Sequence, residues 1–392
     1  MTGMLEVAEA HCDAAIALDR HYVLAHYLRS DLRIQTADRN HIAEMEALIR
    51  EGKLGWSGEV MLRFALGKEC EDLGEHARAF DHVVAGSDLQ RRSISYDSRA
   101  EIGEIDRIIR TQTRAWLASC PAGFRAADPV FVVGLPRTGT TFVERIVASH
   151  SAMTSAGETG AFAVELRRAT KAASNRLDVA DIGISHVDSV AAFGVPPDRR
   201  FIDKTLQNYL YCGIINAALP RAKIVLVRRH PLDACWAIYK THFRGMFSFS
   251  YDQIELAEYY LAFRQLAEHW RSALPSQVLL EVNYEDIVRD QAAESRRLIA
   301  FVGLPWEDEV LQFHESPAPS ATASAVQVRL VRSTLLPLGS GDSIRNGSSH
   351  CTQGSHLRFQ KWNWRDIKNE PHRPSVRLIF GILGDRRHQC CR

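Results

Sequence analysis

The chain has 392 residues, enough for two domains, and its 46% hydrophobic and 24% charged residues are typical of a soluble globular protein. A formal net charge of +1 gives no bulk basic field, so we do not expect a nucleic-acid partner. No apolar run approaches the roughly 18 residues that span a bilayer, and the first residues lack the regions of a signal peptide. The eight Cys show no CxxC pair or disulfide-framework spacing, so we expect reduced thiols and a cytoplasmic protein.

Residues 1–120 predict helices only. Small residues at helical spacing predict one helix that ends near Asp19 and a second that starts near Tyr22, and another such pair surrounds Gly74. Small residues let paired helices approach closely, and the pattern resembles tetratricopeptide repeats, although Arg20 stands where the repeat usually has Pro. The chain begins partway through such a repeat, so we expect an upstream portion. A generic helical bundle is the alternative.

From residue 125 the pattern changes to strands that alternate with helices. The predicted strands are 129–133, 223–227 and 278–282, and the predicted helices are 141–149, 231–242, 254–273 and 294–302. Buried strands separated by helices predict an α/β fold, with a P-loop-like parallel sheet that has helices on both faces. Phosphate ligands in such folds lie at the carboxyl ends of the strands.

The most informative segment is the loop after the first predicted strand, Gly134-Leu-Pro-Arg-Thr-Gly139-Thr-Thr. It keeps the GxxxxG spacing of a phosphate-binding P-loop, but Thr140 stands where the Walker motif has Lys. The backbone N–H groups of such a loop surround an anion, and the next helix adds a partial positive charge. Arg137 can bind phosphate or sulfate oxygens with a bidentate fork. The loop therefore predicts a nucleotide phosphate that is held without the usual Lys and without a metal.

Three further segments carry charged residues in positions that suit a phosphate site. Glu158 follows the helix after the loop and could accept a proton from a hydroxyl group. Lys204 ends a short strand, whereas Arg228 and Arg229 end the strand 223–227 beside a proline that starts a helix. Considered singly, Glu158 and Lys204 are more often solvated surface residues than functional ones. For Arg228 and Arg229, a functional and a purely structural role are equally open.

The four motifs together, in this order along the chain, resemble the sulfotransferase superfamily. Its enzymes transfer a sulfuryl group from 3′-phosphoadenosine 5′-phosphosulfate (PAPS) to a hydroxyl. In more detail, the chain resembles bacterial proteins that join tetratricopeptide-like repeats to a sulfotransferase domain, with a core similar to tyrosylprotein sulfotransferases. The resemblance covers residues 60–329, and residues 1–59 match loosely. It implies a helical domain at 1–120, a sulfotransferase domain at 125–329 and a tail at 330–392.

The resemblance implies a role for each matching residue. The residues that match the loop binding the 5′-phosphosulfate of the donor are Arg137, Thr138, Gly139, Thr140 and Thr141. Glu158 matches the proposed general base, Lys204 the lysine that stabilises the leaving phosphate oxygen, and Arg229 the arginine that binds the 3′-phosphate. Tyr284 aligns with a tyrosine near the donor, and Ser324 with a serine near the transferred group. Arg137, Lys204 and Ser324 would assist catalysis with Glu158, and the scheme requires no metal.

Two features depart from the family pattern. Ala237 stands where the family usually has Ser, eight residues after Arg229, and the lost hydroxyl predicts weaker donor binding. Residues 330–392 contain a Gly-, Ser- and His-rich tract and no helical or strand period. We expect them to form an atypical tail, disordered or altered by a frameshift, with activity impaired as a result.

Two other functions stay open at this point. A P-loop kinase or NTPase is disfavoured by Thr140 and by the lack of a strand-terminal Asp for Mg²⁺ near Val227. A catalytically impaired repeat-protein binding scaffold is favoured by Ala237 and the tail. The sequence does not specify the acceptor, which could be a peptide tyrosine, a sugar or a small molecule. The helical repeats could present a peptide or protein partner.

Overall fold

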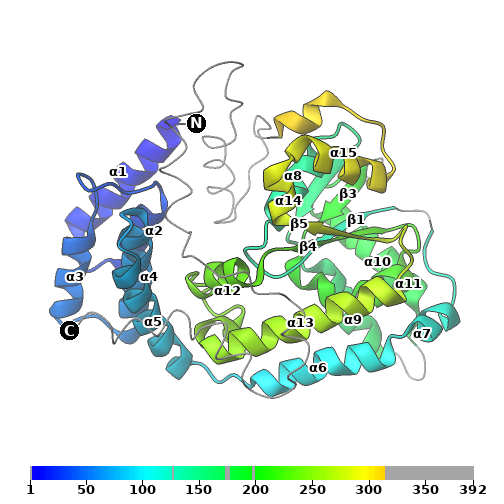
Figure 1. The fold of residues 1–392 in the computed structure, drawn as a ribbon, viewed down its shortest axis with the longest axis horizontal. Helices are drawn as coiled ribbons and strands as arrows, with labels where there is room; N and C mark the ends of the chain where they lie inside the picture. Colours follow the sequence, from blue (N-terminus) through cyan, green and yellow to red (C-terminus); the bar gives the residue numbers. More distant parts are fainter. Residues whose placement is uncertain (1, 126–127, 173–176, 197–198, 314–392) are drawn as a thin grey trace. The chain divides into compact units, whose positions relative to one another are not determined.

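The computed structural model describes residues 2–125, 128–172, 177–196 and 199–313 (Figure 1). Two expectations, the role of Ser324 and the character of the tail 330–392, fall outside the described residues. Within the described part of the chain, no helix combines the length and the apolar character needed to cross a membrane. The described residues form two compact units.

The first unit comprises residues 2–98 and 235–259. Its N-terminal helices are α1 (Thr2–Leu18), α2 (Val23–Asp31), α3 (Ile42–Arg50), α4 (Trp56–Asp72) and α5 (His76–Ser93). Helices α4 and α5 approach closely at Gly67, where a Cβ atom would lie 2.7 Å from Cγ2 of Val83. The prediction of a helical N-terminal region is confirmed, and its similarity to tetratricopeptide repeats stays a prediction.

Residues 235–259 join this unit through a cluster around one carboxylate. Lys240 Nζ donates to the two carboxylate oxygens of Glu71 at 2.7 and 2.6 Å, and Trp236 Nε1 donates to the same side chain at 3.1 Å. Ala237, which lies between Trp236 and Lys240 in the sequence, is buried. The ammonium group of Lys240 therefore pairs with the carboxylate of Glu71, which belongs to the same unit.

The second unit, residues 99–234 and 260–313, contains a five-stranded sheet in which every pairing is parallel. Its order is β2-β3-β1-β4-β5. The strands are β1 (Val130–Val133), β2 (Met153–Gly157), β3 (Arg200–Asp203), β4 (Lys223–Arg228) and β5 (Leu279–Asn283). The α/β prediction is confirmed. Strand β2 was not predicted, because its Thr, Ser, Ala and Gly residues form no apolar run and it lies at an edge of the sheet.

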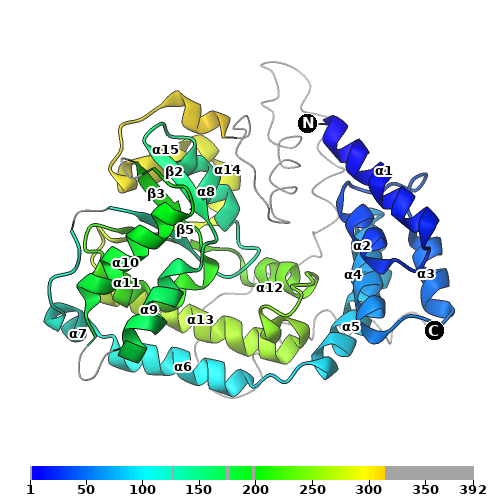
Figure 2. The ribbon, with the colours of Figure 1, turned by 180° about the vertical axis from the view of Figure 1, so that it is seen from behind.

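Helices cover both faces of this sheet (Figures 1 and 2). The helices that follow α5 in the described residues are α6 (Ser98–Thr111), α7 (Arg114–Ser119), α8 (Thr140–Ala148), α9 (Ala161–Ala172), α10 (Val179–Ala192), α11 (Cys212–Ala218), α12 (Pro231–Tyr239), α13 (Gln253–Ala273), α14 (Tyr284–Arg289) and α15 (Gln291–Val302). Short 3₁₀ turns are η1 (Leu206–Leu210), η2 (Ser248–Tyr251) and η3 (Asp308–Gln312). Helices α12 and α13 each contain residues of both units.

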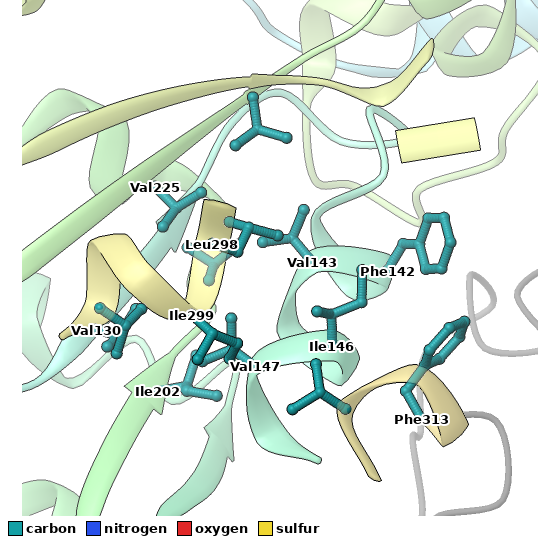
Figure 3. Close-up of a cluster of buried hydrophobic side chains, with 14 of the residues drawn as sticks. Val130, Phe142, Val143, Ile146, Val147, Ile202, Val225, Leu298, Ile299 and Phe313 are labelled. Atoms are coloured by element: carbon teal, nitrogen blue, oxygen red, sulfur yellow. The ribbon is translucent and has the colours of Figure 1, made fainter. Parts of the chain in front are cut away.

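Alternate strand residues enter different cores, as the period of a β-strand requires. Val130 and Val225 pack with Val143 of α8 and Leu298 of α15 in the core that Figure 3 shows. Phe131, between two such positions on β1, instead contacts rings of α9 and α10 on the opposite face. The sheet thus holds α8, and the loop before it, rigidly against β1.

A histidine lies in the core on the α9 and α10 face. His186 is fully buried and stacks on Phe131 with ring centroids 5.4 Å apart, and its Nε2 lies 3.7 Å from Oδ2 of Asp203. Neither ring nitrogen has a hydrogen-bond partner among the described residues. Burial disfavours the charged imidazolium and lowers the pKa of His186 to about 4.

This histidine makes stability depend on pH. The unfolded chain protonates it near its ordinary pKa of 6.5, whereas the folded protein resists protonation until about pH 4, so stability is lost as pH falls from 6.5 towards 4. We expect His186→Phe to remove about 2 kcal/mol of the fall in unfolding free energy between pH 7 and pH 5. Urea denaturation of the wild type and of His186→Phe at pH 7 and pH 5 measures this fall in unfolding free energy. The same fall in both would contradict the assignment.

Candidate functional site

The charged residues singled out from the sequence meet at one edge of the sheet. All five strands are parallel, so their carboxyl ends share that edge. The residues that follow the strands there, in sheet order, are Glu158, Lys204, Gly134 with its loop, Arg229 and Tyr284. The edge therefore collects a base candidate, two cations, an aromatic ring and the glycine-containing loop.

The loop between β1 and α8 is a tight turn with an unusual backbone conformation. Arg137 adopts a left-handed backbone with φ 66°, which is uncommon for a residue with a side chain, and Gly139 follows with φ 100°. Thr138 Oγ1 donates to the carbonyl of Leu135 at 2.7 Å and closes the turn. The N–H groups of Phe142 and Val143 donate to the carbonyl of Gly139 at 2.9 and 3.2 Å, so α8 begins directly after the loop.

Gly139 is needed for space as well as for its backbone angle. A Cβ atom there would lie 2.5 Å from Cδ2 of Tyr284, the first residue of α14. The ring of Tyr284 is itself held, since Arg229 lies 5.0 Å over its centroid and Phe142 packs against its edge. The glycine thus lets the loop after β1 reach the residue after β5.

We expect Gly139→Ala to lower the free energy of unfolding by about 2–4 kcal/mol, from backbone strain together with displacement of the Tyr284 ring. Gly160→Ala is the matched control, because Gly160 also has a positive φ of 63° but has open space at its Cβ position. It should cost about 1–2 kcal/mol from strain alone. Urea denaturation measures both variants, and equal losses would contradict the close approach.

Arg229 connects the loop to the end of β4. Its Nη1 donates to the carbonyl of Arg137 at 3.0 Å, and its guanidinium lies over Tyr284. Its Nε is buried without a hydrogen-bond partner in the described part of the chain. A buried and unpartnered N–H of a cation costs free energy unless a ligand accepts it, so this atom suits an anionic oxygen.

Lys204 lies between two carboxylates. It is 2% exposed, its Nζ donates to Oε1 of Glu158, and it lies 3.7 Å from Oε2 of Glu144. Ser155 Oγ donates to the other oxygen of Glu144. Sequence reasoning missed Glu144, although a signal existed: it is a buried acidic residue in the otherwise apolar face of α8.

The backbone around this lysine is fixed by hydrogen bonds. The N–H of Lys204 donates to the carbonyl of Gly157 at 2.9 Å, and the N–H of Gly160 donates to Oγ1 of Thr205 at 3.0 Å. The buried carboxyl of Asp203 accepts from the N–H of Thr205 at 2.8 Å, and desolvation raises its pKa. The ends of β2 and β3 are thereby locked together.

Other sequence-based expectations have different outcomes. Thr138, Thr140 and Thr141 are buried in and beside the loop, and Ser324 lies outside the described residues. Across the described ranges, no group of three or more His, Cys, Asp or Glu side chains could hold a metal ion. The assembled site combines the P-loop-like turn and Arg229 with the Lys204–Glu158 pair at the carboxyl ends of the strands.

The class that the fold defines is an α/β protein with a P-loop-like turn and two cations at the strand ends. More specifically, residues 129–308 match the model described as the sulfotransferase family. The matched segment contains all five strands of the sheet.

Individual proteins to which the chain is similar include the following three. An uncharacterized protein of Aquifex aeolicus is 27% identical over 348 residues, which are 83% of this chain and 45% of that protein. The chain thus spans less than half the length of this relative. The sulfotransferase of Alicyclobacillus acidocaldarius is 17% identical, with 48% of this chain and 89% of that chain covered and a TM-score of 0.34. The sulfotransferase domain of the Synechococcus olefin synthase is 16% identical, with 56% and 99% covered and a TM-score of 0.37.

Proposed function

We propose that the protein is a PAPS-dependent sulfotransferase that moves a sulfuryl group to a hydroxyl acceptor. One observation carries the proposal. In a domain that matches the sulfotransferase family, the parallel sheet brings a P-loop-like turn, Arg229 and the Lys204–Glu158 pair to a single edge. The Walker Lys is replaced by Thr140 in this loop, which argues against a kinase or NTPase.

The residues of the edge fit a donor that carries two anionic groups. The loop from Arg137 and the first turn of α8 would hold the 5′-phosphosulfate, because they present backbone N–H groups and a guanidinium. Arg229 would hold the 3′-phosphate, since its buried Nε needs an acceptor. Tyr284, under that guanidinium, would lie near the donor.

Glu158 would serve as the general base and Lys204 would stabilise the leaving group. The acceptor oxygen forms a bond to sulfur, the bond between sulfur and the bridging phosphate oxygen breaks, and the hydroxyl proton passes to Glu158. Adenosine 3′,5′-bisphosphate leaves, and the ammonium of Lys204 would offset the charge that develops on its phosphate oxygen. Glu158 is suited to this role because its side chain is 38% exposed and can reach an acceptor.

The acceptor and the setting belong to the same proposal. A peptide tyrosine, a sugar or a small molecule would each supply the hydroxyl, and the helices of the N-terminal region could present a peptide, as tetratricopeptide-like repeats do. The catalytic core would resemble tyrosylprotein sulfotransferases, and the protein would act in the cytoplasm.

Transfer of labelled sulfate from PAPS to a mixed set of acceptors tests the proposal. Thermal shift provides a second readout: adenosine 3′,5′-bisphosphate should stabilise the protein by mass action, and Mg-ATP alone should not. Stabilisation by Mg-ATP alone would indicate a kinase or NTPase instead. Stabilisation by adenosine 3′,5′-bisphosphate without any transfer would indicate a binding scaffold that has lost activity.

A further inference from the structure

A second carboxylate accompanies the Lys–Glu pair of the site. Glu144, from the helix that follows the loop, lies 3.7 Å from Nζ of Lys204, and its other oxygen accepts from Ser155 Oγ on β2. Glu144 and Lys204 are both buried, whereas Glu158 is exposed. The buried ammonium of Lys204 thus has an inner, buried carboxylate, Glu144, and an outer, exposed carboxylate, Glu158.

The two carboxylates differ in what they can do during turnover. Glu158 must leave the ammonium if it is to accept a proton from a hydroxyl, since its Oε1 is taken by Lys204 Nζ. The leaving phosphate oxygen of the donor must reach the same ammonium. A buried cation that exchanges one anionic partner for another needs a fixed counter-charge to stay in place. Glu144 has that position, because the hydroxyl of Ser155 donates to it and its side chain is buried.

We propose that Glu144 is a positioning residue, which anchors Lys204 while the donor phosphate replaces Glu158 as its outer partner. This inference rests on the proposed sulfotransferase function. Its consequence is that binding of the donor frees the base: the Lys204–Glu158 pair opens when a phosphate oxygen takes the ammonium. The acceptor hydroxyl is then deprotonated only in a site that already holds the donor.

Glu144→Gln tests the anchor with an isosteric change that removes only the charge. We expect kcat to fall about 10- to 100-fold through misplacement of Lys204, with the acceptor KM unchanged. Glu144→Asp, which keeps the charge, should retain a higher kcat than Glu144→Gln. The matched control is Glu165→Gln: Glu165 also accepts from a serine, Ser189, and pairs with Arg168, but on α9. It should leave kcat within about twofold of wild type.

A double-mutant cycle separates this role from a structural one. In a Lys204→Met background, Glu144→Gln should cause no further loss of kcat, because the residue through which it acts is absent. A structural role predicts the same loss in both backgrounds. That result, or a kcat of Glu144→Gln within about twofold of wild type, would overturn the inference.

Two further measurements keep the test decisive. If Glu144→Gln does not fold, as judged by its thermal midpoint, Ser155→Ala releases the same carboxylate while keeping its charge, and it should lower kcat about threefold. Unchanged turnover in Ser155→Ala would then count against the anchor. Absence of any transfer by wild type contradicts the proposed function, whereas transfer that requires Glu158 but not Glu144 contradicts only the anchor.

Discussion

Replacing Glu158 by Gln is expected to lower kcat by about 10²- to 10⁴-fold, the usual contribution of a general base. The amide has nearly the shape of the carboxylate but cannot take a proton from the acceptor. Binding of adenosine 3′,5′-bisphosphate should persist, because the loop and Arg229 are untouched. Steady-state transfer assays give kcat, and calorimetric titration gives the dissociation constant.

The same control, Glu165→Gln, reports whether loss of any partly buried glutamate in this unit impairs turnover. It should behave as wild type in both assays. A Glu158→Gln enzyme with a kcat within about tenfold of wild type would exclude Glu158 as the base. Loss of product binding together with turnover would instead show that this residue is needed to form the site.

Replacing Arg229 by Ala is expected to raise the dissociation constant of adenosine 3′,5′-bisphosphate about 100-fold or more. The change removes the donor to the carbonyl of Arg137 that supports the loop, and it would remove the charge-assisted hydrogen bonds that we propose to the 3′-phosphate. Calorimetric titration at fixed ionic strength measures the effect, because exposed charges contribute differently at different salt concentrations.

Arg228→Ala is the control for general loss of positive charge at the end of β4. Arg228 is the preceding residue, but its guanidinium lies 3.5 Å from the carboxylate of Glu281 on β5. We expect the dissociation constant of this variant to stay within about threefold of wild type. An equal effect of the two variants would mean that bulk charge, and not a specific contact of Arg229, holds the nucleotide.

Much of the fold could be predicted from local patterns. Residues 130–133 and 224–227 are apolar throughout and lie in the interior strands β1 and β4, because strands that are buried on both faces need apolar residues on both. Strand β2 escaped prediction for the opposite reason, since an edge strand of small and polar residues owes its pairing to β3 alone. A sequence contains no local signal for such a partner.

The sequence was enough to predict most residues of the site, but not the contacts between them. Arg137, Glu158, Lys204 and Arg229 were identified from their positions near predicted strand ends or loops, and the parallel sheet places their segments at one edge. Glu144 was not identified, because its partner Lys204 is distant in the chain and meets it only across the folded sheet. Its acidic side chain on a buried helix face was the available clue.

The sequence by itself determined that a loop with P-loop spacing follows a buried strand, since glycine spacing and apolar runs are local properties of the chain. Only the tertiary structure decided which charges meet. The order β2-β3-β1-β4-β5 places the end of β3 beside that of β2, so Lys204 pairs with Glu158, and it places β4 beside β1, so Arg229 reaches the carbonyl of Arg137. These partners are far apart in the chain, and hydrogen bonds of the sheet bring them together.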